Sequence, residues 1–137
     1  MTTEQYENGL KIRKEVLGEK YVNEALAKAD DFNRDFQKLV TEYCWGGSWG
    51  RGILSKQQRS IINLGMLAAL NRPHEFKLHF QGAIKNGVSI LELREILIQI
   101  TIYCGVPAAI DAFRIAREVF NENGIDVSQI ETQKANS

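Results

Sequence analysis

The spacing of apolar residues is the feature that most restricts how this chain can fold. Nearly every segment repeats its apolar residues at intervals of three and four, which is the period of an α-helix rather than of a strand. Between residues 32 and 43 they recur at i, i+4, i+7, i+8 and i+11, which predicts a helix with one face toward a core. These residues are Phe32, Phe36, Leu39, Val40 and Tyr43. We therefore expect an all-α fold.

Capping residues divide the chain into six or seven expected helices. Ser55 with Gln58 and Ser89 with Glu92 form capping boxes, and Pro73 suits the first turn of a helix. Asp30 and Asp31 are expected to cap the helix that follows them. The expected helices cover about residues 3–17, 19–29, 32–45, 56–70, 73–86, 90–103 and 106–123, several of them closed by a glycine such as Gly18, Gly87 or Gly124. The glycine-rich stretch 46–54 predicts a loop, and the apolar run up to residue 70 predicts a helix buried on most sides.

The length of 137 residues fits one domain. We expect residues 1–125 to form a single all-α domain and residues 126–137 to be a polar, flexible C-terminal tail. A content of 44% hydrophobic and 25% charged residues is that of an ordinary globular protein. The apolar stripes exceed what one small subunit readily buries, so we also expect the subunits to self-associate.

Charge and cysteine content argue against several classes of partner. The 17 basic residues balance the 17 acidic ones, so no overall charge draws the chain to nucleic acid or to an anionic membrane. We expect a cytoplasmic protein, because no signal-peptide pattern and no apolar run near the ~20 residues of a membrane span is present. Cys44 and Cys104 match neither a secreted disulfide framework nor a zinc site, so we expect reduced thiols and no metal.

One expected helix displays three polar residues that suit a catalytic site. In the segment RPHEFKLH, Arg72, Glu75 and His79 stand at i, i+3 and i+7. At about 100° per residue they share a flank, beside the face that Phe76 and Phe80 turn to the core. A solvated rim with an ordinary pair between Glu75 and His79 explains the same pattern. The spacing alone does not separate the two interpretations.

A second group of candidates lies around the glycine-rich stretch. Glu42 flanks the preceding apolar stripe, and Trp45, Trp49 and Arg51 stand close together in EYCWGGSWGR. Aromatic rings beside flexible backbone and a cation suit the wall of a site for a small planar anion, although the tryptophans equally suit a core or a subunit contact. Arg59 places positive charge in the first turn of the next helix, against the helix dipole. This indicates either a role other than helix stability or a solvated side chain.

Several phrases of the sequence together resemble the carboxymuconolactone decarboxylase family. They are GLKIRKEVLG, WGGSWGRGIL, QRSI, NRPHEFKLHFQGAIKNG and QITIYCGVPAAIDAFRIAREVF, and the resemblance extends from about Tyr6 to Phe120. The decarboxylase pattern R-x-x-E-x-x-x-H fits Arg72, Glu75 and His79. In the related alkylhydroperoxidase branch, cysteines would stand at the first two of these positions. This chain therefore lacks that thiol pair.

The resemblance implies a hexamer of all-α subunits that decarboxylates a small lactone acid in the β-ketoadipate pathway of aromatic catabolism, with neither metal nor organic cofactor. That reaction needs an acid that protonates carbon and cations that hold carboxylates and the developing oxyanion. We interpret His79 as the proton donor, oriented or tuned by Glu75 or Glu42. The candidate substrate-binding residues are Arg51, Arg59, Arg72, Trp45, Trp49 and Cys104.

The sequence also departs from the family pattern. Gly52 and Ile53 replace the Pro-Gly of the usual Arg-Pro-Gly-Leu loop, and Ile110 and Arg114 stand where decarboxylases often have asparagine and histidine. These changes predict a substrate related to the usual one. Two other functions stay open at this point. One is a thiol-dependent peroxidase or reductase that uses Cys104, and the other is a non-catalytic ligand-binding member of the fold.

Overall fold

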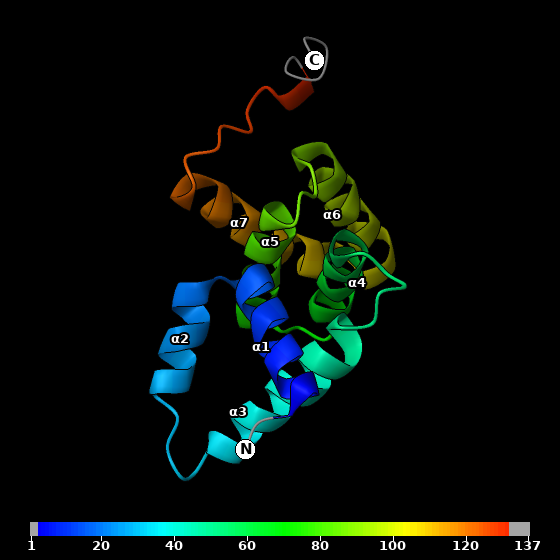
Figure 1. The fold of residues 1–137 in the computed structure, drawn as a ribbon. Coiled ribbons are helices and arrows are strands. Elements are labelled where there is room, and N and C mark those ends of the chain that lie inside the picture. The colour runs from blue at the N-terminus through cyan, green and yellow to red at the C-terminus, as the bar shows by residue number, and fades with distance from the viewer. Residues whose placement is uncertain (1–2, 132–137) are drawn as a thin grey trace. The chain divides into compact units, whose positions relative to one another are not determined.

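The computed structural model describes residues 3–131, and these residues form helices joined by short connections, with no strand among them. Figure 1 shows their order along the chain. The α-helices are α1 (Glu4–Leu17), α2 (Glu19–Ala27), α3 (Arg34–Leu39), α4 (Lys56–Ala69), α5 (Pro73–Lys85), α6 (Ile90–Cys104) and α7 (Val106–Glu122), and the π-helix η1 (Val40–Trp49) continues α3 directly. The expected all-α class is confirmed. The described residues form two compact units that divide between Arg59 and Ser60.

Local capping signals account for most of the helix ends. Both expected capping boxes form: the Ser55 hydroxyl accepts from the Gln58 amide at 3.1 Å, and the Ser89 hydroxyl accepts from the Glu92 amide at the same distance. In each box the N3 side chain accepts in return from the cap amide. Glycines with positive φ follow or cap four helices, at positions 18, 87, 105 and 124.

The first unit is organised by close packing of α1 against η1. Gly9 and Gly46 meet at this crossing, and a Cβ added to Gly9 would lie 2.1 Å from the carbonyl oxygen of Thr41. Only glycine permits so close a backbone approach. Trp45 and Trp49 fill the adjacent core, where they pack with Val16 and stack on one another with ring centroids 5.0 Å apart.

Two expectations for this unit are wrong. Gly46 to Trp49, expected in the loop, are helical, because η1 winds as a π-helix through the two glycines before the chain opens into a short loop. The aspartates do not cap α3. Asp30 instead accepts from the amides of Phe32 and Asn33 in a turn that precedes the helix, and Asn33 stands at the N-cap without a side-chain cap bond.

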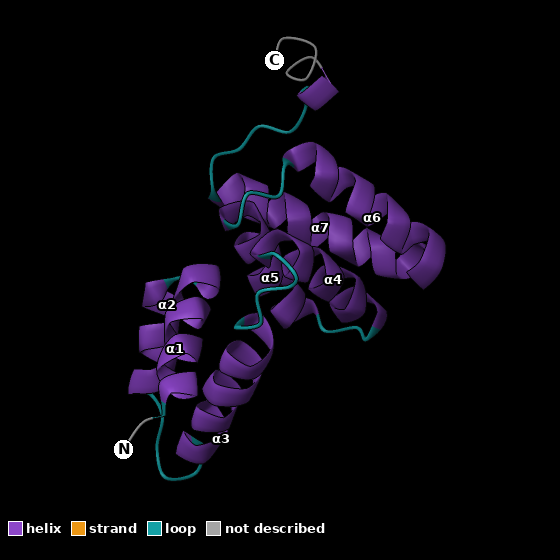
Figure 2. Ribbon diagram, turned by 45° about the vertical axis from the view of Figure 1, so that its right-hand side comes forward, coloured by secondary structure: helices purple, strands orange, loops and turns teal. Residues whose placement is uncertain are grey.

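The second unit has one apolar core, to which α4, α5, α6 and α7 contribute. Phe76 and Phe80 of α5 stack with centroids 6.0 Å apart, and Phe80 meets Phe120 of α7 edge to face at 5.4 Å. An ion pair at 2.8 Å between Lys77 and Glu122 joins the same two helices at the surface. Figure 2 shows α6 and α7 side by side along this core. The expected core face of α5 is thereby confirmed.

One apolar stripe that was expected in the core is exposed, and a helix that was expected to be buried on most sides is buried on one side only. Phe32 is 96% and Phe36 62% exposed, and Leu39 and Tyr43 are likewise open to solvent. Their periodicity was interpreted correctly as amphipathic, but η1 buries its other side, with Thr41, Trp45 and Trp49, against α1. Helix α4 is also less buried than expected. Within it only Ser60 and Leu64 are buried, while Ile62 and Met66 are exposed.

The segment after α7 packs against the second unit. Ile125 and Val127 contact its core, and Glu131 forms an ion pair with Arg94 of α6. Residues 132–137 of the expected tail lie outside the described residues, and the division into a domain of residues 1–125 and a flexible tail stays a prediction. Among the helices of residues 3–131, none combines the length and apolar character that crossing a bilayer requires.

Candidate active site

Helix α5 fixes the three residues of the RPHEFKLH segment relative to the core. Pro73 occupies the first turn, where its missing N–H costs no hydrogen bond. Phe76 and Phe80 are buried, which anchors one face of the helix in the core. The flank beside that face presents Glu75 and His79, as the helical period requires. Burial of the phenylalanines therefore determines where the candidate proton donor stands.

His79 is half-buried, whereas Glu75 and Arg72 are exposed. Burial lowers the pKa of the His79 imidazole below its ordinary value, because the charged form loses hydration. The Glu75 carboxylate, one turn earlier, acts in the opposite direction and raises that pKa, but more weakly. Burial therefore makes the His79 imidazole harder to protonate than a histidine in water.

Arg72 stands at the N-cap of α5, one residue after Asn71, whose φ of 57° is left-handed. Its backbone amide donates to the carbonyl of Leu67 at 3.0 Å, which ties the start of α5 to α4. Its guanidinium makes no hydrogen bond or ion pair with any residue of the described chain. Arg72 and Asp111 of α7 line a cavity of about 20 Å³, which is room for one or two waters. The arginine is therefore available to bind an anion.

The aromatic candidates of the first unit lie in its core. Trp45 is 3% and Trp49 7% exposed, so their rings pack inside this unit. Glu42 is half-buried on η1, and its backbone carbonyl accepts from the Gln5 amide group at 2.9 Å. The observed packing matches the core interpretation of the tryptophans.

Arg59 and Arg51 differ in what they bind. The Arg59 guanidinium donates to the Ser48 hydroxyl at 3.2 Å and to the carbonyl of Arg51 at 3.1 Å. These bonds hold the end of η1 and the loop after it, which explains a cation in the first turn of α4 despite the helix dipole. Arg51 is exposed, and its own guanidinium has no hydrogen-bond or ion-pair partner within residues 3–131.

The sequence-predicted residues thus fall into two groups. The first unit contains Glu42, Trp45, Trp49, Arg51 and Arg59, and the second contains Arg72, Glu75, His79 and Cys104. Cys104 is the last residue of α6 and is a half-buried free thiol. Cys44 of the first unit is also a free thiol. Within the described residues, no three His, Cys, Asp or Glu side chains are grouped so that they could hold a metal ion.

Sequence reasoning missed two residues that act on these candidates. Ser48 accepts from Arg59, and Asp111 shares the small cavity with Arg72. No local signal marks Asp111, because it lies 39 positions after Arg72 and meets it only through the packing of α7 near the start of α5. Ser48 lay within the stretch interpreted as a loop, so its hydrogen bond with Arg59, 11 positions later, was not foreseeable.

Comparison with known proteins bears directly on this arrangement. A family model described as "Carboxymuconolactone decarboxylase family" matches residues 34–118, which is more than half of the chain. The chain belongs to the carboxymuconolactone decarboxylase family. The match begins at the first residue of α3 and ends within α7, so this family region includes every candidate site residue in both units.

Curated relatives extend the match to most of the chain. The 4-carboxymuconolactone decarboxylase of Acinetobacter baylyi is 40% identical over 122 residues, which are 89% of this chain and 91% of that protein. Nitrosuccinic acid decarboxylase npaB of Metarhizium robertsii is 41% identical over 117 residues, or 85% of this chain and 82% of that one. A shorter match to a 4-carboxymuconolactone decarboxylase of Pseudomonas putida is 37% identical over 43 residues, which are 31% of this chain and 90% of that one. The relatives support a decarboxylase function for this member of the carboxymuconolactone decarboxylase family.

Proposed function

We propose that this protein is a cofactor-free carboxy-lyase that acts on 4-carboxymuconolactone or a closely related small acid. The observation that supports this most strongly is the 40% identity over 89% of the chain to a 4-carboxymuconolactone decarboxylase. The R-x-x-E-x-x-x-H pattern adds support, because an arginine with no side-chain partner among residues 3–131 caps the helix that carries the half-buried histidine.

The chemistry of such a substrate determines what the protein must supply. A carboxylate on the γ carbon of an α,β-unsaturated lactone leaves as carbon dioxide, and its electron pair passes through the alkene into the lactone carbonyl. The resulting dienolate then takes a proton at carbon. The substrate is its own electron sink, so the protein has to bind the carboxylate, stabilise the oxyanion and deliver the proton.

The residues of α5 suit these tasks. His79 is the proposed proton donor, and Glu75 raises its affinity for a proton. Arg72 is proposed to bind a carboxylate or the oxyanion, since a guanidinium without an internal partner can do so bidentately. Arg51 is proposed for the same kind of contact. Arg59 is assigned to holding the loop rather than to the substrate, because both of its terminal nitrogens are already used.

The remaining candidates have supporting roles in this proposal. Glu42 is proposed to help orient the proton donor, and Cys104 to contribute to the wall of the substrate site. Trp45 and Trp49 are proposed to shape the site from the core rather than to contact the anion with open ring faces, because both rings are buried.

A second substrate is favoured by the relative that is 41% identical and named for nitrosuccinic acid. In that acid one carboxylate sits on the carbon that bears the nitro group. Its loss as carbon dioxide sends the electron pair into the nitro group, and the nitronate is then protonated at carbon. The demands on the protein are the same as for the lactone: anion binding, an oxyanion contact and a proton donor. The altered loop residues Gly52 and Ile53 make this alternative worth direct comparison.

The test is to supply 4-carboxymuconolactone and nitrosuccinic acid separately to the purified protein and to measure carbon dioxide release. Release without added thiol from either acid supports the proposed lyase, and the ratio of kcat/KM values identifies the preferred substrate. Thiol-dependent consumption of peroxide with no carbon dioxide release would instead support a peroxidase that uses Cys104. Binding without turnover of either acid would support a non-catalytic member of the family.

We also propose that the protein assembles as a hexamer in the cytoplasm and serves aromatic-compound breakdown by the β-ketoadipate pathway. The exposed stripe of α3 and η1, formed by Phe32, Phe36, Leu39 and Tyr43, is a surface of the kind that monomers rarely leave open. Phe36→Asp should lower the mass measured by light scattering, whereas Lys38→Gln on the same helix should not. A wild-type protein that stays monomeric near 15.5 kDa would contradict the assembly.

A further inference from the structure

We infer that a groove between α6 and α7 is a binding site for a small carboxylate with an apolar body, separate from the candidate site on α5. The groove encloses a cavity of about 160 Å³ in the second unit. Besides Ala116 of α7, each helix contributes three side chains spaced at i, i+4 and i+7, with an arginine in the middle of each stripe. They are Ile90, Arg94 and Leu97 from α6 and Phe113, Arg117 and Phe120 from α7.

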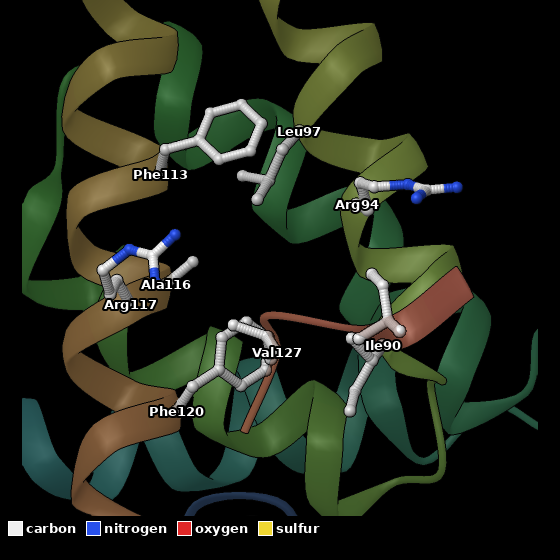
Figure 3. A pocket seen from close by; sticks show the side chains of 9 residues that line it. Ile90, Arg94, Leu97, Phe113, Ala116, Arg117, Phe120 and Val127 are labelled. Atoms are coloured by element: carbon white, nitrogen blue, oxygen red, sulfur yellow. The ribbon is translucent and has the colours of Figure 1, made fainter. Parts of the chain in front are cut away.

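The two arginines of this groove are in different states. Arg94 forms ion pairs with Glu95 at 3.4 Å and with Glu131, and in Figure 3 its guanidinium points away from the cavity. Arg117 makes no hydrogen bond or ion pair with any residue between 3 and 131. Figure 3 shows Arg117 on α7 at a level between Phe113 and Phe120, with its guanidinium on the cavity side of the helix. A cation that lines a largely apolar cavity, with no carboxylate partner among the described residues, favours an anionic ligand with an apolar part.

The segment after α7 contributes apolar side chains to part of the groove. Val127 and Ile130, from the segment after α7, line the same cavity, and the adjacent Glu131 neutralises Arg94. Part of the groove is therefore covered by apolar side chains of the chain's own last segment, while the Glu131 carboxylate pairs with the Arg94 guanidinium, which points away from the cavity. At the α7 side, the Arg117 guanidinium is the cation that the carboxylate of the ligand would contact.

The size of the cavity limits the ligand to about one ring. A cavity of about 150 Å³ lined by Leu, Ile and Phe is known in another protein to bind benzene, and the walls here include Leu97, Phe113 and Phe120. Benzoate combines such a ring with one carboxylate, so it is the simplest probe of the inferred site. None of Arg72, Glu75 and His79 lines this cavity, so binding here does not depend on the proposed reaction.

The experiment is a titration of the full-length protein with benzoate, followed by backbone amide shifts in NMR spectra. The shifts should appear along α6 and α7, at residues near Arg94 and Arg117. Arg117→Gln should raise the Kd for benzoate roughly ten- to a hundredfold, which is the loss of one charge-assisted contact. Arg117→Lys should restore part of the affinity, because it keeps the charge but not the planar fork.

Two matched variants make the outcome specific. Arg114→Gln removes an exposed arginine of the same helix that is already paired with Asp111 and Glu118, so benzoate binding should stay at the wild-type level. Arg72→Gln should leave it unchanged as well. Neutral benzamide should bind to the wild-type protein more weakly than benzoate does. On the Arg117→Gln variant, benzamide and benzoate should bind with equal affinity.

Three results would overturn the inference. One is the absence of any shift with millimolar benzoate, and another is an unchanged Kd in an Arg117→Gln protein whose circular dichroism is native. The third is loss of binding in Arg72→Gln with shifts confined to the start of α5, which would place benzoate at the proposed substrate site instead. The Arg117→Gln variant should decarboxylate the substrate at the wild-type rate, because Arg117 has no part in the proposed reaction.

Discussion

Helix α5 and the continuous α3–η1 segment have apolar stripes of similar period, yet they use them in opposite ways. Phe76 and Phe80 of α5 lie fully inside the second unit, whereas Phe32 and Phe36 before and within α3 project into solvent. The difference lies in the neighbours. Helix α5 packs its stripe against α7, while η1 turns another side, with Trp45, to α1. A hydrophobic stripe thus predicts that a surface will be buried, but it does not identify the segment or subunit that covers it.

The largest expected effect is on catalysis by His79, which the buried stripe of α5 holds in place. His79→Gln should keep the fold, because glutamine is a good helix former, and should lower kcat by roughly 10²–10⁴-fold as general acid catalysis is lost. KM should change much less if arginines hold the substrate. Steady-state kinetics on the substrate identified above gives the result.

His74→Gln is the matched control, because His74 is exposed on the same helix and lies off the shared flank. It should cost little in kcat. Equal and large losses in both variants, accompanied by a loss of helical circular dichroism, would show that α5 is only a structural element at these positions. Near-native kcat in both would return the flank to an ordinary solvated rim.

The next effect compares the two stripes directly. Phe80→Ala empties a fully buried position and should lower the free energy of unfolding by roughly 3–5 kcal/mol. Phe36→Ala, at a side chain that is 62% exposed, should change the stability of the subunit far less. Urea titrations monitored by circular dichroism, at a concentration where both variants have the same mass, measure the two values. Similar losses would mean that the α3 stripe is buried in the folded subunit in solution.

A smaller effect concerns backbone packing in the two units. Gly9→Ala forces a Cβ to within 2.1 Å of the Thr41 carbonyl and should lower the free energy of unfolding by about 1–3 kcal/mol. Gly65→Ala in α4 meets no atom within 4 Å and should instead raise it by roughly 0.5–1 kcal/mol through helix propensity. The opposite signs, read from thermal or urea unfolding, would confirm that the α1–η1 crossing is set by glycine. A neutral Gly9→Ala would refute it.

The smallest expected effect is a pH dependence at His79. Its pKa in the folded protein lies below its unfolded value of about 6.5, so the unfolded chain binds the proton more readily. Stability from this group is present above pH 6.5 or so and falls as the pH drops toward the folded pKa. His79→Gln should flatten this part of the stability curve. A general acid of lowered pKa also predicts that kcat/KM declines as the pH rises through that pKa, and a flat profile would argue against the assigned role.

Local signals in the sequence were sufficient for much of the fold. The capping boxes at Ser55 and Ser89 and the glycines at 18 and 105 depend on hydrogen bonds and φ values within a few residues, so the sequence contains all the information they require. The core face of α5 was equally accessible, since Phe76, Phe80 and Ala83 repeat with the helical period.

The π-helix could not be predicted in this way. Gly46 and Gly47 normally indicate flexible backbone, and here the helix passes through them because Gly46 must lie against α1 without a side chain. That requirement comes from the backbone of Gln5, 41 positions earlier, whose carbonyl oxygen would lie 2.3 Å from a Cβ at Gly46. The exposure of Phe32 and Phe36 was unpredictable for a related reason: burial is a property of the neighbours, and these are chosen by packing at the other side of η1.

The sequence was sufficient to name the candidate site residues, but it did not predict their burial, their pKa values or their hydrogen bonds. The spacing of Glu75 and His79 was sufficient to place them one turn apart on α5, whereas Arg72 stands at the N-cap, outside the helical turns. The lowered pKa of His79 depends on how deeply that flank is buried, which no local pattern specifies. The bonds of Arg59 to Ser48 and Arg51 likewise depend on the path of the chain at the end of η1. The catalytic roles of these residues stay predictions.

The stacked pair of Trp45 and Trp49 gives the molecule an internal optical reporter. These are the only two tryptophans of the sequence, and both belong to the first unit. Intrinsic fluorescence excited at the indole band therefore follows the melting of that unit alone, whereas far-ultraviolet circular dichroism averages the helices of both. Coincident transitions by the two probes would show that the units unfold as one cooperative system, and separated transitions would resolve their individual stabilities without any label.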